Sequence, residues 1–400
     1  MVHYYTEIIR FWNKINFITK RNLKKNNLLE TKEFPKYLYA TYRILWEKAS
    51  EKIITKELKG IDKQFLKRVR IFSWNEALNN KDEKEEISIS EAIPSFMIDT
   101  LLPMMNIEVL RKNIKFMDGL VKEIDITLRI NKLRGKTNDD VLPIQIRENF
   151  KKNGIDFRED SDIPELFWIL RAQKNRVIRS SSYQNGSLIL QDKASAAVIQ
   201  VLAPKKEDKI CDMCAAPGIK TSLIAEYMNN KGHIIAGEFL TERVNTMALL
   251  LKKLNVLNVH ILNTDSIIFP IRFQNYFDRI LLDAPCTGSG AFLASPELKW
   301  RQNRGFLHQN IIIQKKLIEN AIKILKPGGI LVYSTCSLYA EEGEYQILDF
   351  IDYLEPLDLP NWFSPSYKVE DNTIPGTGRL FPSLHHTQGF FIGKFKKKEI

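Results

Sequence analysis

The spacing of apolar residues along the chain predicts helices in its first part. Between residues 6 and 66, apolar side chains recur three and four positions apart and no glycine occurs before Gly60, which is the pattern of successive amphipathic helices. A polar, acidic stretch at residues 79–86 then interrupts the pattern and predicts a linker or long loop. We therefore expect an all-helical module over residues 1–90.

A mixed pattern follows and predicts a small unit of helices and strands. Two helices, an alternating strand, a third helix and a short second strand are predicted at residues 93–102, 107–117, 123–131, 141–153 and 176–180. We place a small α/β subdomain over residues 91–185.

From about Ser187 onward, hydrophobic runs typical of strands alternate with helical stretches. The predicted strands are residues 209–213, 233–238, 259–263, 279–283 and 330–334, and the predicted helices are residues 221–230, 242–254 and 309–325. Residues 326–329 (KPGG) are expected to end the last of these helices and to turn into the next strand. Continuous apolar strands that alternate with helices are typical of a parallel sheet buried on both faces. The predicted fold class is therefore α/β, with a Rossmann-like, mostly parallel sheet over residues 186–400.

Composition and charge exclude several classes of protein and indicate a setting and a partner. The hydrophobic share of 44% and the charged share of 27% exclude a disordered, collagenous or coiled-coil chain. No apolar run reaches the ~20 residues that cross a bilayer, and the first 25 residues carry too many charges for a signal peptide. Four cysteines are too few for a disulfide framework and indicate a reducing, cytoplasmic setting. The 59 basic and 48 acidic side chains leave a net charge of +11, which favours a nucleic acid as partner.

The excess of positive charge is concentrated near the start of the chain. Residues 1–36 hold eight Lys and Arg against three Glu, a local net charge of +5, and aromatic residues lie among them, including Tyr4, Tyr5, Phe11, Trp12 and Phe17. Such a segment is compatible with a phosphate-binding surface. It is equally compatible with a solvated helix face that covers an aromatic core.

The first predicted strand–turn–helix unit of the sheet carries a loop suited to a cofactor. Ala215, Ala216 and Gly218 let a ligand approach the backbone closely, and the following helix presents its N-terminus. The glycine patterns of the dinucleotide-binding and Walker loops are both absent. Glu238 follows Gly218 by 20 residues, at a strand end where a carboxylate can accept hydrogen bonds from a ribose. The loop and this acid together predict an adenosine-containing cofactor, and a solvated strand-end carboxylate is the alternative for Glu238.

Further chemically active residues end neighbouring predicted strands. Asp265 and Asp283 are acids at strand ends, and Cys286 and Cys336 each follow a strand closely. Because the carboxyl ends of parallel strands meet at one edge of a sheet, these side chains are expected near the cofactor loop. Two thiols at a cofactor pocket favour covalent catalysis at an electrophilic carbon.

Zinc is the competing interpretation of the cysteines. Cys211 and Cys214 form one C-x-x-C pair, but no second pair of Cys or His follows at finger spacing. We therefore predict no metal site, and we expect Cys211 to be a small buried apolar residue. A redox role for the pair is the other alternative.

These residues resemble the motifs of the Nop/Sun family of S-adenosylmethionine-dependent RNA (cytosine-5) methyltransferases. The similarity spans roughly residues 93–395. Its motifs are LRIN at 128–131, QDKAS at 191–195, DMCAAPGIK at 212–220, DAPC at 283–286, PELKW at 296–300, TCS at 335–337 and GFF at 389–391. Some positions depart from the family pattern. Ile219 replaces a second glycine and Gly343 replaces an asparagine, while Ser383 and Gln388 replace a frequent His and Asp.

The resemblance implies a role for each matching residue. It makes Cys336 the nucleophile, Cys286 a second cysteine that acts in product release, and Asp283 a group near the target base. It places the following residues around S-adenosylmethionine: Cys214, Ala215, Ala216, Pro217, Gly218, Ile219, Lys220, Glu238, Arg243, Asp265 and Asp283.

The implied reaction is methyl transfer to carbon 5 of a cytosine in tRNA or rRNA. A thiolate that adds to carbon 6 turns carbon 5 into a nucleophile, and a protonated Asp283 would hydrogen-bond to ring nitrogen 3 if burial raised its pKa. The partner is then RNA, held by residues 1–90 and 91–185, with no membrane and no obligatory protein partner. Two alternatives stay open: a methyltransferase that acts on uracil, DNA or protein, and a non-catalytic RNA-binding assembly factor.

Overall fold

The computed structural model describes residues 2–24, 31–79, 81–120, 125–135, 141–269 and 271–399. Its contacts divide the chain into two compact units, Met1–Asp118 with Phe292–Arg304, and Gly119–Ala291 with Gly305–Ile400. This division differs from the three consecutive segments expected from the sequence, because a short segment from the second half of the chain packs with the N-terminal helices. The domain boundaries near residues 90 and 185 stay predictions.

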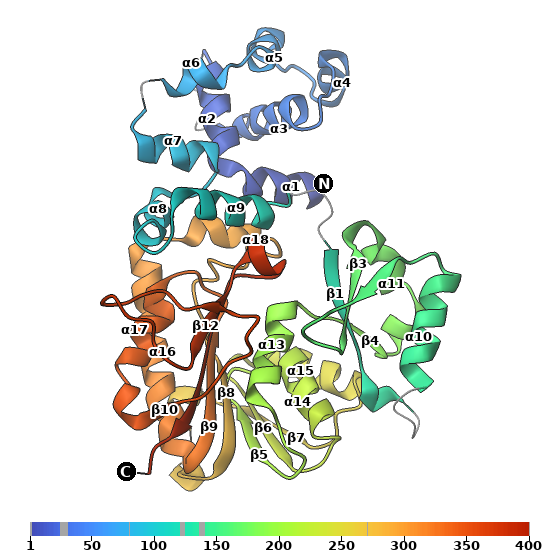
Figure 1. The fold of residues 1–400 in the computed structure, drawn as a ribbon. Coiled ribbons are helices and arrows are strands. Elements are labelled where there is room, and N and C mark those ends of the chain that lie inside the picture. Colours follow the sequence, from blue (N-terminus) through green and yellow to red (C-terminus); the bar gives the residue numbers. More distant parts are fainter. Residues whose placement is uncertain are drawn as a thin grey trace. The chain divides into compact units, whose positions relative to one another are not determined.

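The first unit is built from helices (Figure 1). In chain order they are α1 Val2–Arg10, α2 Trp12–Asn22, α3 Phe34–Leu45, α4 Glu51–Glu57, α5 Lys63–Arg70, α6 Trp74–Leu78, α7 Glu83–Ser90, α8 Ser95–Leu101, α9 Ile107–Met117 and the 3-10 turn η6 Pro296–Arg301. The predicted helices at residues 93–102 and 107–117 are confirmed by α8 and α9. Several N-terminal aromatic residues are core residues: Phe11 is buried, and the ring of Tyr4 packs edge-on against Tyr39 at 5.0 Å.

The linker predicted at residues 79–86 is wrong for the part that the structure describes. Helix α7 begins at Glu83, and the Asp82 side chain caps it by accepting the Glu85 N–H at 2.7 Å. Acidic residues in a first turn also stabilise a helix by their interaction with its dipole. The same acidic composition therefore suits a solvated loop and a helix start, which is why the pattern was ambiguous. Asn80 lies outside the described residues.

Buried charges join α1 to the segment Phe292–Arg304 within the first unit. The ammonium of Lys299 lies 2.6 Å from Asp118, and both side chains are at most 3% exposed. Arg10 donates to the carbonyl oxygens of Met117 at 3.0 Å and Phe292 at 3.2 Å. Lys299 also donates to the Arg10 carbonyl. Deleting α1 would therefore remove partners from buried groups, so surface substitutions are the better probe of this unit.

The second unit contains a small antiparallel sheet. Its strands are β1 Asp125–Ile130, β2 Phe157–Glu159, β3 Leu166–Leu170 and β4 Leu188–Leu190, in the order β2-β3-β1-β4. Helices α10 Val141–Lys152, α11 Lys174–Ile178 and α12 Ser181–Gln184 accompany it. Strand β1 and helix α10 confirm two predictions, although residues 123 and 124 of the predicted strand lie outside the described residues.

The short strand predicted at residues 176–180 is wrong, because this segment belongs mainly to helix α11. The β-branched pair Val177 and Ile178 suggested a strand. In the structure Val177 is fully buried in the core of the small sheet, and this tertiary contact overrides the local preference.

The large sheet of the second unit confirms the predicted α/β class. Its parallel strands are β5 Lys209–Asp212, β6 His233–Glu238, β7 Val259–Asn263, β8 Phe277–Asp283 and β9 Leu325–Thr335. Antiparallel strands β10 Leu354–Pro356, β11 Ser364–Pro365, β12 Thr377–Leu380 and β13 Phe390–Lys397 complete it, in the order β11-β12-β13-β9-β8-β5-β6-β7 with β10 on β13. The sequence did not predict these last four. Strand β9 begins at Leu325, directly after its helix and before the expected turn.

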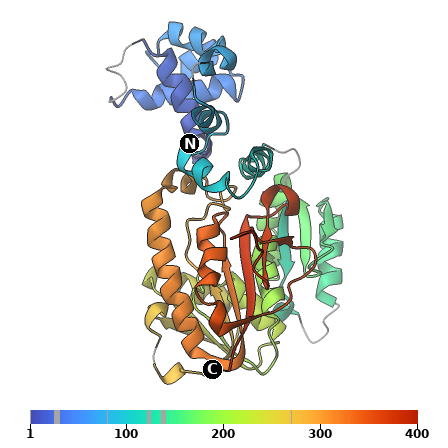
Figure 2. The same cartoon turned by 60° about the vertical axis from the view of Figure 1, so that its left-hand side comes forward.

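Helices cover both faces of the large sheet (Figures 1 and 2). One face carries α13 Lys193–Leu202, α14 Ile219–Tyr227 and α15 Thr241–Lys253, and the other carries α16 Arg304–Ile324 and α17 Glu344–Leu348. Successive residues of β8 point to opposite faces of the sheet. Leu281 packs with the first group of helices, and Ile280 and Leu282 pack with the second. Among the described residues, we find no helix with the length and apolarity needed to cross a membrane.

Candidate active site

The predicted cofactor loop lies between β5 and α14, at the carboxyl edge of the parallel strands. Gly218 takes a φ of +101°, and a Cβ there would approach Met247 and Leu251 to 3.1–3.2 Å. Glycine therefore suits this position both for its backbone and for its packing. The Ala215 N–H donates to the Gly237 carbonyl oxygen at 2.9 Å, which fixes the loop beside β6.

The structure brings the second predicted cofactor group to the same place. Glu238 ends β6, is 5% exposed and lies 3.1 Å from the guanidinium of Arg243. Arg243 also donates to the Ala216 carbonyl oxygen at 2.7 Å, so the loop and the carboxylate are joined. Asp265 follows β7 and caps η4 Ser266–Ile268 by accepting the Ile267 N–H at 2.9 Å. Aspartate is a common cap at the start of a helix, so this contact is an ordinary structural role for Asp265.

Sequence reasoning did not single out Asp212, the last residue of β5. Its carboxylate accepts a hydrogen bond from the Thr221 hydroxyl at 2.7 Å. Burial raises the pKa of Asp212 to about 7, with a contribution from the nearby charge of Asp283 and against the lowering effect of the hydrogen bond from Thr221. The sequence did hold an indication of this residue, because Asp212 is a further acid at the end of a strand.

Lys220 and Asp283 form an ion pair of 2.6 Å beside this loop. The other carboxylate oxygen of Asp283 accepts from the Ser334 hydroxyl at 2.8 Å. Burial opposes the charge of Lys220, but the negative charges of Asp283, Cys336 and Asp212 outweigh it and raise the pKa of Lys220. The pair therefore places a cation near the Cys336 sulfur.

The two thiols predicted at neighbouring strand ends are in contact. Cys286 follows β8, Cys336 follows β9, and their sulfur atoms are 3.3 Å apart. A hydrogen bond from the Gly290 N–H to the Cys336 carbonyl oxygen, at 3.0 Å, joins the two loops. The hydrogen bond with Cys336, and then burial, raise the pKa of the Cys286 thiol well above its ordinary value. Cys211 is fully buried in β5, as expected of a small apolar residue.

Two buried glutamates near the thiols were also missed. Glu344 forms a bidentate ion pair with Arg379 on β12, at 2.7 and 2.5 Å, and neither side chain is exposed. Arg379 donates in addition to the carbonyl oxygens of Ser337 and Tyr339, just after Cys336. Glu342 bonds to the residue after Cys286. These partners are far apart in sequence, so spacing alone gives no signal for them.

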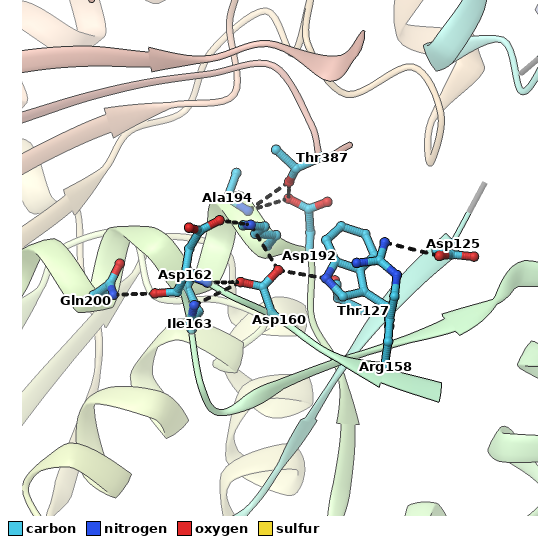
Figure 3. Close-up of polar contacts among 12 residues, drawn as sticks. Asp125, Thr127, Arg158, Asp160, Asp162, Ile163, Asp192, Ala194, Gln200 and Thr387 are labelled. Atoms are coloured by element: carbon cyan, nitrogen blue, oxygen red, sulfur yellow. Dashed lines mark hydrogen bonds and ion pairs between the residues drawn. The ribbon is translucent and has the colours of Figure 1, made fainter. Parts of the chain in front are cut away.

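The QDKAS motif joins the small sheet to the C-terminal segment of the second unit (Figure 3). Asp192 accepts from the Ala194 N–H at 3.0 Å and from the Thr387 hydroxyl at 2.6 Å. The next residue, Lys193, contacts Asp160 at 2.9 Å and Asp162 at 2.5 Å in the turn before β3. Thr387 leads to Gly389, whose N–H donates to Gly290 at 2.9 Å in the Cys286 loop. The motif is thus connected to the thiols as well as to the small sheet.

The fold and this edge of the sheet define a Rossmann-like methyltransferase, and known proteins identify the family. The family model for 16S rRNA methyltransferase RsmB/F matches residues 199–396. The tRNA (cytosine(49)-C(5))-methyltransferase of Pyrococcus abyssi is 33% identical over 296 residues, which are 71% of this chain and 91% of that protein. The chain therefore belongs to the Nop/Sun family of RNA cytosine-C5 methyltransferases, and the resemblance of the motifs is confirmed.

This chain is also similar to a longer human protein in sequence and to a solved structure in fold. The human 28S rRNA (cytosine(4447)-C(5))-methyltransferase is 28% identical over 78% of this chain, but the chain spans only 39% of that protein. The crystal structure of the protein PH0851 is similar over 99% of this chain and 89% of its own length, with a TM-score of 0.81 and 25% identity.

Proposed function

We propose that this protein transfers a methyl group from S-adenosylmethionine to carbon 5 of a cytosine in tRNA or rRNA. Family membership supports the reaction and the methyl donor. The observation that carries the mechanism is the pair of thiols 3.3 Å apart beside the Lys220–Asp283 ion pair. The names of the relatives support both RNA classes, because one methylates a tRNA and another a 28S rRNA.

The residues at the sheet edge fit the methyl donor. S-adenosylmethionine, when bound, supplies a methyl group on a positively charged sulfur. Glu238 is a nearly buried carboxylate at a strand end, suited to ribose hydroxyls. The loop from Cys214 to Lys220 offers small side chains and a helix N-terminus. We assign Arg243, Asp265 and Asp283 to the same site.

We assign the attack on carbon 6 of the cytosine to Cys336. Carbon 5 is too weak a nucleophile to accept a methyl group until a thiolate adds at carbon 6. A nearby cation stabilises a thiolate, and Lys220 is close enough to Cys336 for the two charges to interact. The cytosine must leave its stack to reach both thiols, so the substrate is single-stranded or flipped-out RNA.

We assign Asp283 the role of a hydrogen-bond acceptor. This differs from the expectation that a protonated Asp283 donates a hydrogen bond to ring nitrogen 3. One of its oxygens pairs with the Lys220 ammonium and the other accepts a hydrogen bond from the Ser334 hydroxyl, so both contacts use Asp283 as an acceptor. A carboxylate accepts hydrogen bonds only, so it suits the exocyclic amino group of cytosine. Uracil has a carbonyl oxygen at that position, so Asp283 in its role as an acceptor favours cytosine over uracil.

Release of the product is the step that we assign to Cys286. The methylated adduct must lose its carbon 5 proton while the bond from Cys336 to carbon 6 breaks. The largest cause of the raised pKa of Cys286 is its hydrogen bond with Cys336, and this cause disappears once Cys336 is bonded to the base. Once its own proton has passed to a water, the Cys286 thiolate can accept the carbon 5 proton, directly or through a water. The electron pair of the broken C5–H bond then restores the C5–C6 double bond and expels Cys336 as a thiolate. Both working thiols must stay reduced, which supports our proposal of a reducing, cytoplasmic setting.

The proposal is tested with purified protein, labelled S-adenosylmethionine, and tRNA and rRNA transcripts. We expect 5-methylcytosine in digested RNA, at a position that bisulfite sequencing of cellular RNA also reports when the gene is present and loses when it is deleted. Binding of S-adenosylmethionine without any 5-methylcytosine would contradict the proposed function.

Substitution of Glu238 tests the cofactor site. Glu238→Ala should weaken the binding of S-adenosylmethionine by about 1–3 kcal/mol, because charge-assisted hydrogen bonds to the ribose are lost. Isothermal titration measures the affinity and circular dichroism checks the fold. Glu242→Ala, an exposed residue in the first turn of α15, is the control and should bind normally. Equal affinity of the Glu238 variant would remove this residue from the site.

Substitution of basic residues on the first unit tests its contact with RNA. Lys20, Arg21 and Lys24 are exposed. Changing all three to Gln should flatten the dependence of log binding constant on log salt by up to about 2, since each lost phosphate contact with a single strand removes about 0.7. The control changes three exposed lysines of the same unit outside the first 36 residues, Lys52, Lys56 and Lys63, and should leave the slope nearer to the wild-type value. If both variants keep the wild-type dependence of binding on salt, residues 20–24 form only a solvated face.

A further inference from the structure

Glu342 lies at the end of η7 Ala340–Glu342 with no exposed surface. One carboxylate oxygen accepts the Thr287 N–H at 2.9 Å and the Gln314 side-chain amide at 3.0 Å. The other accepts the Thr287 hydroxyl at 2.5 Å. Thr287 directly follows Cys286, so the side chain of Glu342 holds the Cys286 loop from inside the protein.

The backbone of Glu342 contacts the other thiol loop. Its carbonyl oxygen accepts from the Tyr333 hydroxyl at 2.8 Å and from the Thr335 hydroxyl at 3.2 Å. Thr335 directly precedes Cys336. One residue therefore bonds to the neighbours of both thiols, and it does so without touching either sulfur in the described contacts.

Gln314 on α16 strengthens this arrangement from the other side of the Cys286 loop. Its amide nitrogen lies within hydrogen-bonding distance of Glu342 and also of the Pro285 carbonyl oxygen, at 2.9 Å. Residues 285 and 287 are thus both held, and Cys286 between them has little freedom to move away from Cys336.

The charge of Glu342 also acts on the Cys286 thiol. Burial raises the pKa of Glu342, and hydrogen bonds from Ser337, Thr287 and Gln314 oppose this shift by stabilising the charged form. The negative charge contributes to the raised pKa of Cys286, after the contact with Cys336 and burial. A protonated Cys286 does not compete with Cys336 as the attacking nucleophile.

We propose that Glu342 is a positioning residue that fixes Cys286 against Cys336 and thereby gives the two thiols their separate roles. The roles themselves rest on the proposed covalent mechanism. The placement of Glu342 does not, because it follows from contacts within the folded chain. The experiment therefore has one arm without RNA and one arm with it.

The first arm measures the alkylation of Cys286 by iodoacetamide as a function of pH, in full-length protein with Cys336→Ala. Only the thiolate reacts, and peptide mass spectrometry separates Cys286 from Cys211 and Cys214. Glu342→Gln keeps the size and one acceptor oxygen but removes the charge, so the pH profile should shift to lower pH. Glu341→Gln removes a charge from the neighbouring side chain and should leave the profile in place. An unshifted profile for a folded Glu342→Gln protein would overturn the electrostatic part of the proposal.

The second arm measures turnover and adduct release with RNA. We expect Glu342→Gln and Glu342→Asp to lower kcat by about 10- to 100-fold, the loss typical of a ~1 Å displacement of a reacting group, while the KM for S-adenosylmethionine stays within about twofold of the wild-type value. A protein–RNA adduct should persist in both variants, as in a Cys286 variant. Glu341→Gln should turn over normally. Wild-type release rates in both Glu342 variants would overturn the positioning role.

Thr287→Val provides a second route if the Glu342 variants fail to fold. It removes one donor to the Glu342 carboxylate and leaves the charge and the backbone bond in place. Adduct release should then slow by a smaller factor, with no shift of the alkylation profile comparable to that of Glu342→Gln. Release at the wild-type rate would count against the proposal. If wild-type protein forms no 5-methylcytosine at all, the proposed function fails, and the alkylation arm still decides the placement of Glu342.

Discussion

Replacing Cys336 with alanine should abolish methyl transfer together with every covalent protein–RNA species. This thiol is the group assigned to activate the ring, and carbon 5 does not attack the methyl donor without it. Loss should reach the detection limit in an assay of methyl incorporation into RNA. The binding of S-adenosylmethionine should persist, because Glu238 and the Cys214–Lys220 loop remain.

Cys286→Ala should fail in a different way. Attack and methyl transfer stay possible, but the adduct loses the group assigned to its breakdown. A protein–RNA band that survives denaturing electrophoresis should accumulate, and it should require S-adenosylmethionine. The double variant should lack the band, because the link runs through Cys336.

The opposite pattern would reverse the two assignments. An adduct that forms in Cys336→Ala and is lost in Cys286→Ala would make Cys286 the nucleophile. The 3.3 Å between the sulfur atoms places both close to one target atom, so this experiment, rather than their position, decides between them.

Arg379→Met should destabilise the second unit by about 3–5 kcal/mol, the cost typical of breaking a buried ion pair. Glu344 would lose its cationic partner at 0% exposure, and the carbonyl oxygens of Ser337 and Tyr339 would lose their donor. Urea denaturation followed by circular dichroism measures the free energy of unfolding. Activity should fall as well, since Arg379 holds the chain directly after Cys336.

The matched variant is the double change Arg379→Met with Glu344→Leu. It removes both charges and should recover much of the lost stability, because well-packed apolar residues often replace a buried ion pair without cost. Lys315→Ala breaks the half-exposed pair with Asp349 and should have far less effect than Arg379→Met. If the Arg379→Met protein were as stable as the wild type, the buried pair would contribute little to the free energy of unfolding.

The sequence predicted the parallel strands well because each is a continuous apolar run between helical stretches. Strands β6 and β7 have the bounds expected from that pattern. The antiparallel strands β10 to β13 were missed because several of them are short and their pairing depends on residues far along the chain, as in the register of β13 with β9. The acidic start of α7 and the β-branched residues of α11 misled local reasoning in the ways described above.

For the candidate site, the chemically active residues were easier to predict than the buried residues that hold their loops in place. The acids and thiols stand at strand ends, and the topology then brings them to one edge. Arg379 and Glu344 are 35 positions apart, and Glu342 and Thr287 are 55 positions apart. Hydrogen bonds over such separations follow from the folded backbone, and spacing gave no indication of them.

The buried pair of Asp118 and Lys299 has a consequence for how the chain is made. Its members are 181 positions apart and lie in the same compact unit. A ribosome that adds about 5–20 residues per second needs roughly 10–35 s to travel between them. During that interval the N-terminal helices emerge without the segment that completes their core, and the second unit has received most of its parallel strands. The first helices to be synthesised therefore belong to a unit that is completed only late in translation.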